Sequence, residues 1–331
     1  MLPPKVQILV LQYNNSADTV KCLQSLKSLD YPNFAVVIID NASLTEHRER
    51  IKEFLNSTHP EKLRNGAGYS LQTNHSNLGY SGGNNLGIKY ALEGGADYVL
   101  VLNNDTTVST DFLTKMIEIG GSDSKIGIVG PALDEGARAV CGGKIEWLKA
   151  ELHHRDVQTT NYTLLTTRHS LPINSCLIPH MLDKTNYRLQ TGVYIPGAAM
   201  LIKRKVVEKI GLLDERYFLY FEDADYCLQA RRAGYDLAVV PEAVIYHKVS
   251  SSTRELGAPT LLYYHYRNAL LFNARNGPLW AKLLLPFWSI FIIAKQLIKI
   301  VLLPQKRPAS EAILRGVMDF YRGRFGPMSE S

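Results

Sequence analysis

The stretch Tyr98-Val-Leu-Val-Leu-Asn-Asn-Asp-Thr106 decides the fold. Its apolar residues run without interruption from Val99 to Leu102, which is typical of a strand buried on both faces, as in a parallel sheet. The run stops at Asn103-Asn104-Asp105. Because open α/β sheets bind ligands at the carboxyl ends of their strands, Asp105 is a candidate oxygen ligand for Mg²⁺ or Mn²⁺. The alternative for this stretch alone is a polar turn whose Asp caps the next helix.

Strand and helix patterns alternate on both sides of this run. We expect strands at 6–11, 34–39, 69–73, 98–102 and 126–129, and helices near 16–26, 46–55, 85–92 and 112–119. This alternation predicts an α/β fold with a doubly wound, mostly parallel, Rossmann-like sheet. From 134 to about 190 the pattern breaks down, and we expect a variable insertion on the acceptor side with some strand content. Order returns with helices at 205–210 and near 222–232 and strands at 237–240 and 244–247.

The composition indicates a globular protein of a reducing compartment. The chain has 331 residues, 46% of them hydrophobic, which is enough for one large domain with an appendage. Its cysteines, Cys22, Cys141, Cys176 and Cys227, form no CxxC pair, so neither a zinc knuckle nor a disulfide framework is predicted. The start Met1-Leu-Pro-Pro-Lys5 lacks the pattern of a signal peptide, and we expect a cytoplasmic protein.

The net charge of +6 is unevenly distributed. From Thr260 onward there are ten Lys and Arg against three Asp and Glu (+7), and the remainder has 27 against 28 (−1). The basic residues therefore belong to the C-terminal region. This distribution argues against a nucleic-acid groove across the main domain and favours an anionic surface as the partner of the C-terminal region.

Two polar loops follow predicted strands. Asp40-Asn41 ends the second strand, where a carboxylate can accept hydrogen bonds from a ribose or a base; the alternative is a helix-entry turn. The loop from Asn77 to Asn85 carries glycines next to amides, so its backbone can approach a ligand closely, and the following helix N-terminus favours anions. It matches neither a P-loop nor a GxGxxG motif.

A carboxylate cluster and a histidine complete the candidates. Glu222-Asp-Ala-Asp225 follows the aromatic run Tyr217–Phe221, and carboxylates beside such a wall can have shifted pKa values and act as bases. A solvated first helical turn is the alternative. His247 ends an apolar run and is either a metal ligand or a structural residue.

The order of these motifs resembles the family 2 inverting glycosyltransferases with a GT-A fold, in the bacterial rhamnosyltransferase-like branch. The matching blocks cover about residues 5–250: Val10-Leu-Gln-Tyr-Asn14, Ile39-Asp-Asn-Ala-Ser43, Asn77 to Gly87, Leu102-Asn-Asn-Asp-Thr106, Pro196-Gly-Ala-Ala-Met200, Leu213-Asp-Glu215, Phe218 to Asp225 and His247. A weaker match continues through Tyr266-Arg-Asn268.

The resemblance implies a role for each matched residue. Nucleotide-binding roles fall to Gln12, Asn14, Asp40, Asn77, Gly79, Gly82, Asn85, Asn103 and Asn104. Asp105 and His247 would hold Mg²⁺ or Mn²⁺ on the diphosphate, and Asp223 would be the catalytic base, supported by Glu222 and Asp225. One departure is that Asn103 replaces the first carboxylate of an Asp-x-Asp motif, which leaves open whether Asn103 or Asn104 faces the metal.

The reaction implied is a single displacement with inversion. A sugar, such as rhamnose, would pass from a dTDP- or UDP-sugar to a hydroxyl of a glycan or polyprenyl-linked acceptor in cell-surface polysaccharide synthesis. Two other functions are a catalytically silent nucleotide-sugar-binding partner and a sugar-phosphate nucleotidyltransferase. The latter would need a basic phosphate-binding loop, and Leu11-Gln-Tyr-Asn-Asn15 contains no Lys or Arg.

The predicted domains are 1–255, catalytic, and 256–331, helical and basic. Residues 283–294 are apolar apart from Ser289, and Lys282, Lys295 and Lys299 bracket this run. Trp280 and Trp288 are suited to a membrane interface. Because a spanning helix needs about 20 apolar residues, we expect peripheral attachment to the cytoplasmic face of the inner membrane. Packing on the catalytic domain and a homodimer contact are the alternatives.

Overall fold

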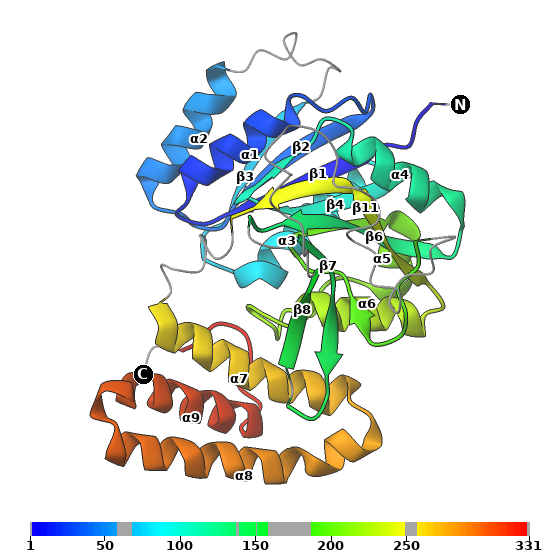
Figure 1. Cartoon of the computed structure of the whole chain (residues 1–331). Helices are drawn as coiled ribbons and strands as arrows, with labels where there is room; N and C mark the ends of the chain where they lie inside the picture. Colours follow the sequence, from blue (N-terminus) through cyan, green and yellow to red (C-terminus); the bar gives the residue numbers. More distant parts are fainter. Residues whose placement is uncertain are drawn as a thin grey trace.

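The computed structural model describes residues 2–57, 68–136, 139–149, 151–157, 187–248 and 257–329. A sheet with helices on both faces forms the larger part of the molecule, and three C-terminal helices lie together at one end (Figure 1). The predicted α/β architecture with a helical C-terminal region is therefore confirmed.

The strands at one end of the sheet order are all parallel, whereas the remaining strands pair in both directions. Its order is β3(Tyr69–Thr73), β2(Phe34–Asp40), β1(Val6–Gln12), β4(Tyr98–Asn103), β10(Ala199–Lys203), β6(Ile126–Asp134), β11(Asp236–His247) and β5(Thr106–Val108). Strands β3, β2, β1 and β4 are parallel, as predicted. Strand β10 runs antiparallel to both β4 and β6, because it enters the sheet from the insertion and needs no crossover helix.

Helices cover both faces of the sheet because side chains alternate along each strand. On one face, Ile8 and Val10 share a core with residues of α1(Ser16–Leu26) and α4(Phe112–Ser122). On the other face, Leu9 belongs to a core with residues of α3(Gly79–Glu93) and α6(Glu222–Arg232). Helices α2(Thr45–Ser57) and α5(Arg204–Ile210) complete the layers. The alternation fixes which strand residues can reach a ligand at the sheet's edge.

Two strand predictions need correction. The short strand β5 follows Asp105 directly, where the sequence predicted none, and it pairs with the end of β11. Strand β11 is one continuous strand with a register shift between Val240 and Val244, where two strands were expected. The shift interrupts the alternation of apolar residues, and for this reason the sequence pattern indicated two strands.

The insertion contributes a hairpin. Strands β7(Ala139–Glu146) and β8(Glu151–Val157) pair antiparallel, and the short strand β9(Val193–Tyr194) pairs with β7. The predicted strand content of 134–190 is therefore confirmed, although residues 158–186 lie outside the described residues. The ring of Trp147, at the hairpin tip, stacks on Phe272 with the ring centroids 5.4 Å apart, so the hairpin contacts the C-terminal helices.

The C-terminal region contains α7(Gly257–Asn276), α8(Leu279–Leu302), a short 3-10 helix η4(Pro304–Lys306) and α9(Arg307–Tyr321). Leu270, Leu285, Ile292, Ile313 and Val317 form their shared core. Helix α8 is longer than the apolar run identified in the sequence, and it continues through Pro286. Helix α7 packs against α6, which joins this region to the sheet domain.

Candidate active site

A cavity of about 420 Å³ opens at the carboxyl ends of β1, β2 and β4. Seven predicted site residues line it: Asn77, Gly79, Asn103, Asn104, Glu222, Asp223 and His247. They come from segments up to 170 positions apart (247 minus 77), which the parallel strands bring to one edge. Their meeting at one cavity supports the interpretation, made from the order of the motifs along the sequence, that they belong to one site.

Asn41 organises the loop that begins α3. Its Nδ2 donates to Asn77 Oδ1 at 2.8 Å and to the Gly79 carbonyl at 3.1 Å, and its Oδ1 accepts from the Leu78 N–H. Gly79 has φ +70°, and a Cβ there would lie 2.2 Å from the Phe218 carbonyl oxygen. A glycine is therefore required where α3 approaches the loop before α6.

Three predicted nucleotide contacts lie outside the cavity wall. Asp40 is fully buried, accepts from Gln12 Nε2 at 2.9 Å and lies 3.4 Å from Arg48 Nε. Gln12 also donates to Ser43 Oγ, and Asn14 Oδ1 accepts from the Leu44 N–H. These side chains therefore hold the turns after β1 and β2 together. Tyr13 and Asn41 take the wall positions instead.

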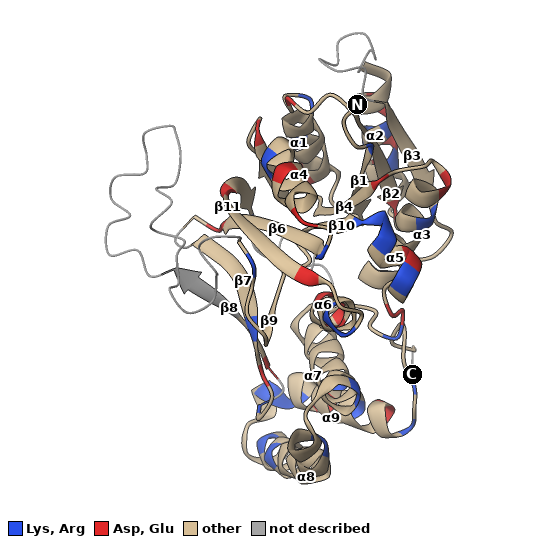
Figure 2. Cartoon of the chain, turned by 90° about the vertical axis from the view of Figure 1, so that its right-hand side faces the viewer, with Lys and Arg blue, Asp and Glu red and all other residues tan. Residues whose placement is uncertain are grey.

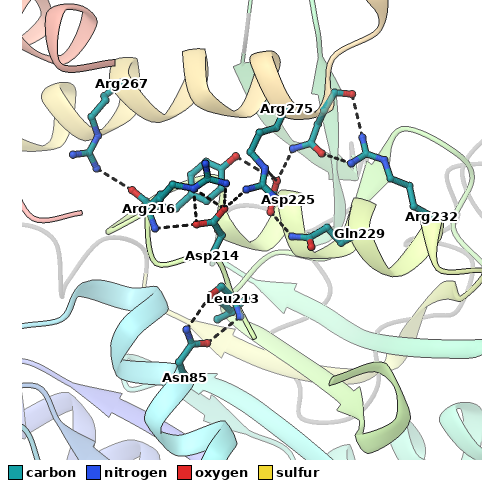
Figure 3. A network of polar contacts seen from close by, with 11 residues as sticks. Asn85, Leu213, Asp214, Arg216, Asp225, Gln229, Arg232, Arg267 and Arg275 are labelled. Carbon is teal, nitrogen blue, oxygen red and sulfur yellow. Dashed lines mark hydrogen bonds and ion pairs between the residues drawn. The ribbon is translucent and has the colours of Figure 1, made fainter. Parts of the chain in front are cut away.

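Gly82 and Asn85 also do not line the cavity. Gly82 is buried, and a Cβ there would lie 2.8 Å from Leu78 Cβ. Asn85 Nδ2 donates to the Leu213 carbonyl at 2.9 Å, and its Oδ1 accepts from the Leu213 N–H at 3.0 Å (Figure 3). Asn85 thus ties α3 to the chain segment that leads into α6. The nucleotide-binding role that the resemblance implied for Asn85 is therefore not reflected in its contacts in this structure.

The predicted metal ligands meet because β5 pairs with β11. Thr106 lies opposite His247 in that pairing. As a result His247 Nε2 is 3.5 Å from Asp105 Oδ1, and both side chains are at least 89% buried. The capping alternative for Asp105 does not hold, since α4 begins at Phe112 with Asp111 at its N-cap.

Glu135 is a third member of this group that the sequence did not reveal. Its Oε1 lies 3.4 Å from His247 Nδ1, and its side chain is 2% exposed. With Asp105 and His247 it lines a second cavity of about 530 Å³, which adjoins the first at His247. Glu135 was missed because it follows the part of β6 that extends past the expected strand end.

The field at this group favours a cation. Burial alone would lower the pKa of His247, but hydrogen bonding and charge from Asp105 and Glu135 raise it to about 9. Two buried carboxylates and an imidazole are also a donor set that Mn²⁺ or Mg²⁺ accepts. Asn104 Nδ2 donates to Thr19 Oγ1 at 2.9 Å, which holds its amide toward α1, whereas Asn103 is partly exposed in the wall of the first cavity.

The carboxylate pair Glu222 and Asp223, which lines the first cavity, begins α6. Tyr220 and Phe221 have φ of 73° and 74°, so the chain turns sharply into Glu222. Asp223 Oδ2 accepts from the Gly197 N–H at 2.8 Å and Oδ1 from the Ala224 N–H at 2.7 Å, which orients this partly exposed carboxylate in the wall. Burial, followed by the charge of Asp223, raises the pKa of Glu222 well above its ordinary value. Of the pair, burial disfavours the charged form of Glu222, whereas Asp223 is the partly exposed carboxyl group in the cavity wall.

Asp225, predicted to support catalysis, does not line the cavity. It is 1% exposed and accepts hydrogen bonds from Tyr217 Oη, Gln229 Nε2 and Asn276 Nδ2 (Figure 3). Its Oδ1 also lies 3.5 Å from Arg275 Nε. Asp225 therefore joins α6 to α7. The helical period explains the difference, because residues two apart on a helix point in different directions.

Three wall residues come from outside the recognised motifs. Leu152 belongs to the hairpin strand β8, Tyr194 to β9 and His265 to α7. Burial lowers the pKa of His265, so it presents a neutral imidazole. The His265 ring lies 5.5 Å from that of Phe221. Only the tertiary packing of the insertion and α7 brings these residues to the cavity.

The model of the family described as "Glycosyl transferase family 2" matches residues 7–211. The chain belongs to this family. A low-salt glycan biosynthesis hexosyltransferase of Haloferax volcanii is 22% identical over 282 residues, 80% of this chain and 74% of that protein. A dTDP-rhamnosyl transferase of Shigella flexneri is 22% identical over 82% of this chain and 80% of its own length. A solved mannosyltransferase of Pyrobaculum calidifontis, in complex with GDP-Man and Mn²⁺, shares the fold with a TM-score of 0.56, 14% identity and coverage of 97% and 88%.

The protonated state of Glu222 is testable through stability. Because its pKa is raised in the folded state, the folded protein binds more protons than the unfolded chain above about pH 4.3. Stability should therefore fall as pH rises from there toward the folded-state pKa. Glu222→Gln should match wild type near pH 4 and become the more stable protein toward pH 8. Melting temperatures across this range, with the exposed Glu118→Gln as control, measure the effect; a difference that is independent of pH would contradict it.

Proposed function

We propose that this family 2 glycosyltransferase is metal-dependent and inverting, and that it transfers a hexosyl or deoxyhexosyl unit, such as rhamnosyl, from a nucleoside diphosphate sugar to a hydroxyl of a glycan or lipid-linked acceptor. The observation that carries the proposal is one cavity with Asp223 on one wall and His247, beside Asp105 and Glu135, on another. The names of its hexosyltransferase and rhamnosyl transferase relatives support the class of donor.

The donor would occupy the end of the cavity formed by Tyr13, Asn41 and Asn77. Side-chain amides and a phenol ring there suit a nucleoside, which needs hydrogen-bond partners and an aromatic surface. Among the described residues lining this cavity, none is Lys or Arg. The diphosphate therefore needs its charge balanced by another group.

Asp105, Glu135 and His247 would hold a divalent cation that balances this charge. When bound, Mg²⁺ or Mn²⁺ stabilises the negative charge that develops on a departing diphosphate. The buried carboxylates and the imidazole supply the hard ligands such an ion prefers. Asn103, partly exposed in the cavity wall at the end of β4, would be the amide nearer the ion, since the Asn104 amide donates to Thr19.

Asp223 would take the proton of the acceptor hydroxyl. As the acceptor oxygen bonds to the anomeric carbon, the bond from that carbon to the diphosphate oxygen breaks, and the proton passes to the Asp223 carboxylate. One displacement inverts the anomeric carbon. Glu222 is buried, and burial raises its pKa and disfavours its carboxylate form, so it is poorly suited to be the nucleophile of a double displacement.

The alternatives have less support. A silent binding partner would not need an oriented carboxylate at Asp223 together with a cation site at Asp105. A nucleotidyltransferase would need basic residues at the phosphates, and the described cavity lining has none.

Metal dependence is the first prediction of this proposal. Sugar transfer by wild type should be lost in excess chelator and restored by Mn²⁺ or Mg²⁺. Asp105→Asn removes one anionic ligand while keeping the backbone bond from the Lys248 N–H to the Asp105 carbonyl, so it should need more metal for half-maximal rate. Both are measured as transfer rate against metal concentration. Full activity of wild type in excess chelator would show that no metal is used.

The base is tested by comparing two acidic residues of α6. Removing a positioned base lowers a rate by about 10²–10⁴-fold, so Asp223→Asn should lower turnover by that amount with donor binding unchanged. Asp225→Asn should lower stability, since Asp225 joins α6 to α7, with turnover per folded molecule near wild type. Turnover, donor titration and thermal unfolding separate the two; a dead Asp225→Asn beside a normal Asp223→Asn would reverse the assignment.

We also propose that α8 attaches the enzyme to the cytoplasmic face of a membrane, beside a lipid-linked acceptor. By length and composition α8 could cross a membrane, but Ala281, Leu285, Ser289, Ile292 and Gln296 form a buried stripe along it. Gln296 Oε1 accepts from Ser310 Oγ and Ser289 Oγ accepts from Tyr321 Oη. These contacts with α9 favour a helix that lies along the surface.

The opposite face of α8 is apolar and exposed. Leu283, Phe287 and Ile290 are 64%, 68% and 64% exposed. Lys and Arg residues are distributed over α7, α8 and α9 (Figure 2). An exposed apolar helix face with basic neighbours fits an anionic bilayer interface, where basic residues contribute about 1 kcal/mol each.

Membrane attachment is tested by point substitutions, because truncation at 257 would also remove the Asn276 contact with Asp225. Leu283→Gln, Phe287→Gln and Ile290→Gln together should abolish co-sedimentation with phosphatidylglycerol vesicles at low salt. Leu2→Gln with Leu44→Gln, 92% and 60% exposed on the sheet domain, is the control. If wild type stays in the supernatant and the triple variant turns a dimer into a monomer in light scattering, α8 is a dimer contact instead.

A further inference from the structure

The turn before the catalytic pair is held from the C-terminal helix α7. Asn268 is fully buried, and its Nδ2 donates to the carbonyls of Leu219 at 2.7 Å and Tyr220 at 3.3 Å. These carbonyls belong to the segment 216–221, which we call the base loop because it leads into Asp223. The anchor lies directly beside Tyr220 and Phe221, the consecutive non-glycine residues with positive φ. Such conformations persist only when surrounding contacts hold them.

Arg267 fixes the direction of the Asn268 amide. Its Nε–H donates to Asn268 Oδ1 at 3.0 Å, so the amide NH₂ must face the base loop. The guanidinium is 0% exposed and lies over the rings of Tyr263, Tyr264 and Phe325. These ring contacts hold the Arg267 guanidinium in place independently of its hydrogen bond to Asn268.

Arg267 also reaches the start of the base loop. Its Nη2 donates to the Arg216 carbonyl at 3.3 Å (Figure 3), and its Nη1 donates to the Gly326 carbonyl at 2.8 Å. Arg267 and Asn268 together hold both ends of a segment of six residues (216–221) through its backbone carbonyls. Because these contacts involve backbone carbonyls, they fix the path of the base loop and do not depend on which side chains the loop carries.

The other side of the base loop contacts the donor end of the cavity. The Tyr80 N–H donates to the Phe218 carbonyl at 2.8 Å, and Ser81 Oγ donates to the Tyr217 carbonyl at 2.7 Å. The loop thus lies between α3, which borders the donor, and α7. A shift of its α7 side would move Glu222 and Asp223 relative to the donor without altering the donor's own contacts.

We propose that Arg267 and Asn268 are positioning residues of the transfer reaction: α7 sets the path of the base loop and through it the place of the Asp223 carboxylate. This inference rests on the proposed function only for its effect on turnover. The C-terminal helices are then part of the active site's support, besides any role at a membrane.

The test compares two buried asparagines of α7. Asn268→Asp keeps an acceptor for Arg267 but loses both donations to the base loop. Asn273→Ala is the matched control, since Asn273 also donates to a carbonyl, that of Trp147 at 3.1 Å, away from the base loop. Asn268→Ser, which keeps one donor, is the second variant if Asn268→Asp does not fold. The readouts are hydrogen exchange of the peptide 216–226, turnover, donor KM and melting temperature, all on the full chain.

We expect Asn268→Asp to exchange amide hydrogens in 216–226 at least about tenfold faster, in line with local opening. Turnover should fall by about 10²-fold with donor KM close to wild type, because small misplacements of reacting groups have effects of that size. Asn268→Ser should change both in the same direction by less. Asn273→Ala should lower the melting temperature and leave both readouts near wild type.

Two results would overturn the inference: exchange in 216–226 at the wild-type rate in the Asn268 variants, or an equal loss of turnover in Asn273→Ala. The exchange measurement needs no substrate. If wild type transfers no sugar from any nucleotide sugar tested, the proposed function fails, while exchange still decides whether α7 holds the loop.

Discussion

The hydrogen bond from the Tyr80 N–H to the Phe218 carbonyl joins the two halves of the cavity. It links the start of α3, which borders the donor end, to the loop that carries the chain into Glu222 and Asp223. The contact requires the absence of a Cβ at Gly79, which would collide with the same carbonyl. Much of the site geometry follows from this approach. Ser81 and Asn85 add further contacts from α3 to the same part of the chain. Ser81 Oγ donates to the Tyr217 carbonyl, and Asn85 Nδ2 donates to the Leu213 carbonyl.

The carboxylates of the site fall into two groups. Asp105 and Glu135 adjoin His247 in the second cavity, and Glu222 and Asp223 line the first cavity, which His247 also lines. Acidic walls would repel a diphosphate, so a bound cation reconciles the site with an anionic donor. Within the second pair, Glu222 is buried with a raised pKa, and Asp223 is partly exposed in the cavity wall. The proposed function assigns the proton acceptor to Asp223 and the cation to the group around His247.

The sequence predicted the strand core and several residues of the cavity walls because these depend on local patterns. The apolar run of β4 placed Asn103 and Asp105 at the end of that strand, and the aromatic run before Glu222 marked another part of the lining. The antiparallel direction of β10 and the extra strand β5 were not predictable in this way, since strand direction depends on connections through the insertion.

The errors at the site concern side-chain direction. Asp40, Asn85 and Asp225 are polar residues beside the cavity that turn inward and bind backbone or side chains of neighbouring elements. A motif records that a polar residue is needed at a position but not which group it contacts. Glu135, Leu152 and His265 were missed because they come from the end of β6, the hairpin and α7, whose packing no local pattern reveals.

The central claim of the proposed function is that Asp223 serves one direct displacement at the anomeric carbon, since Glu222 is buried and its raised pKa disfavours the carboxylate that a covalent intermediate would need. The anomeric configuration of the first-formed product measures this most directly, by proton NMR of the transferred sugar. The account predicts a product whose configuration is opposite to that of the donor. A product that retains the donor configuration would contradict it, because a single in-line displacement inverts the anomeric carbon.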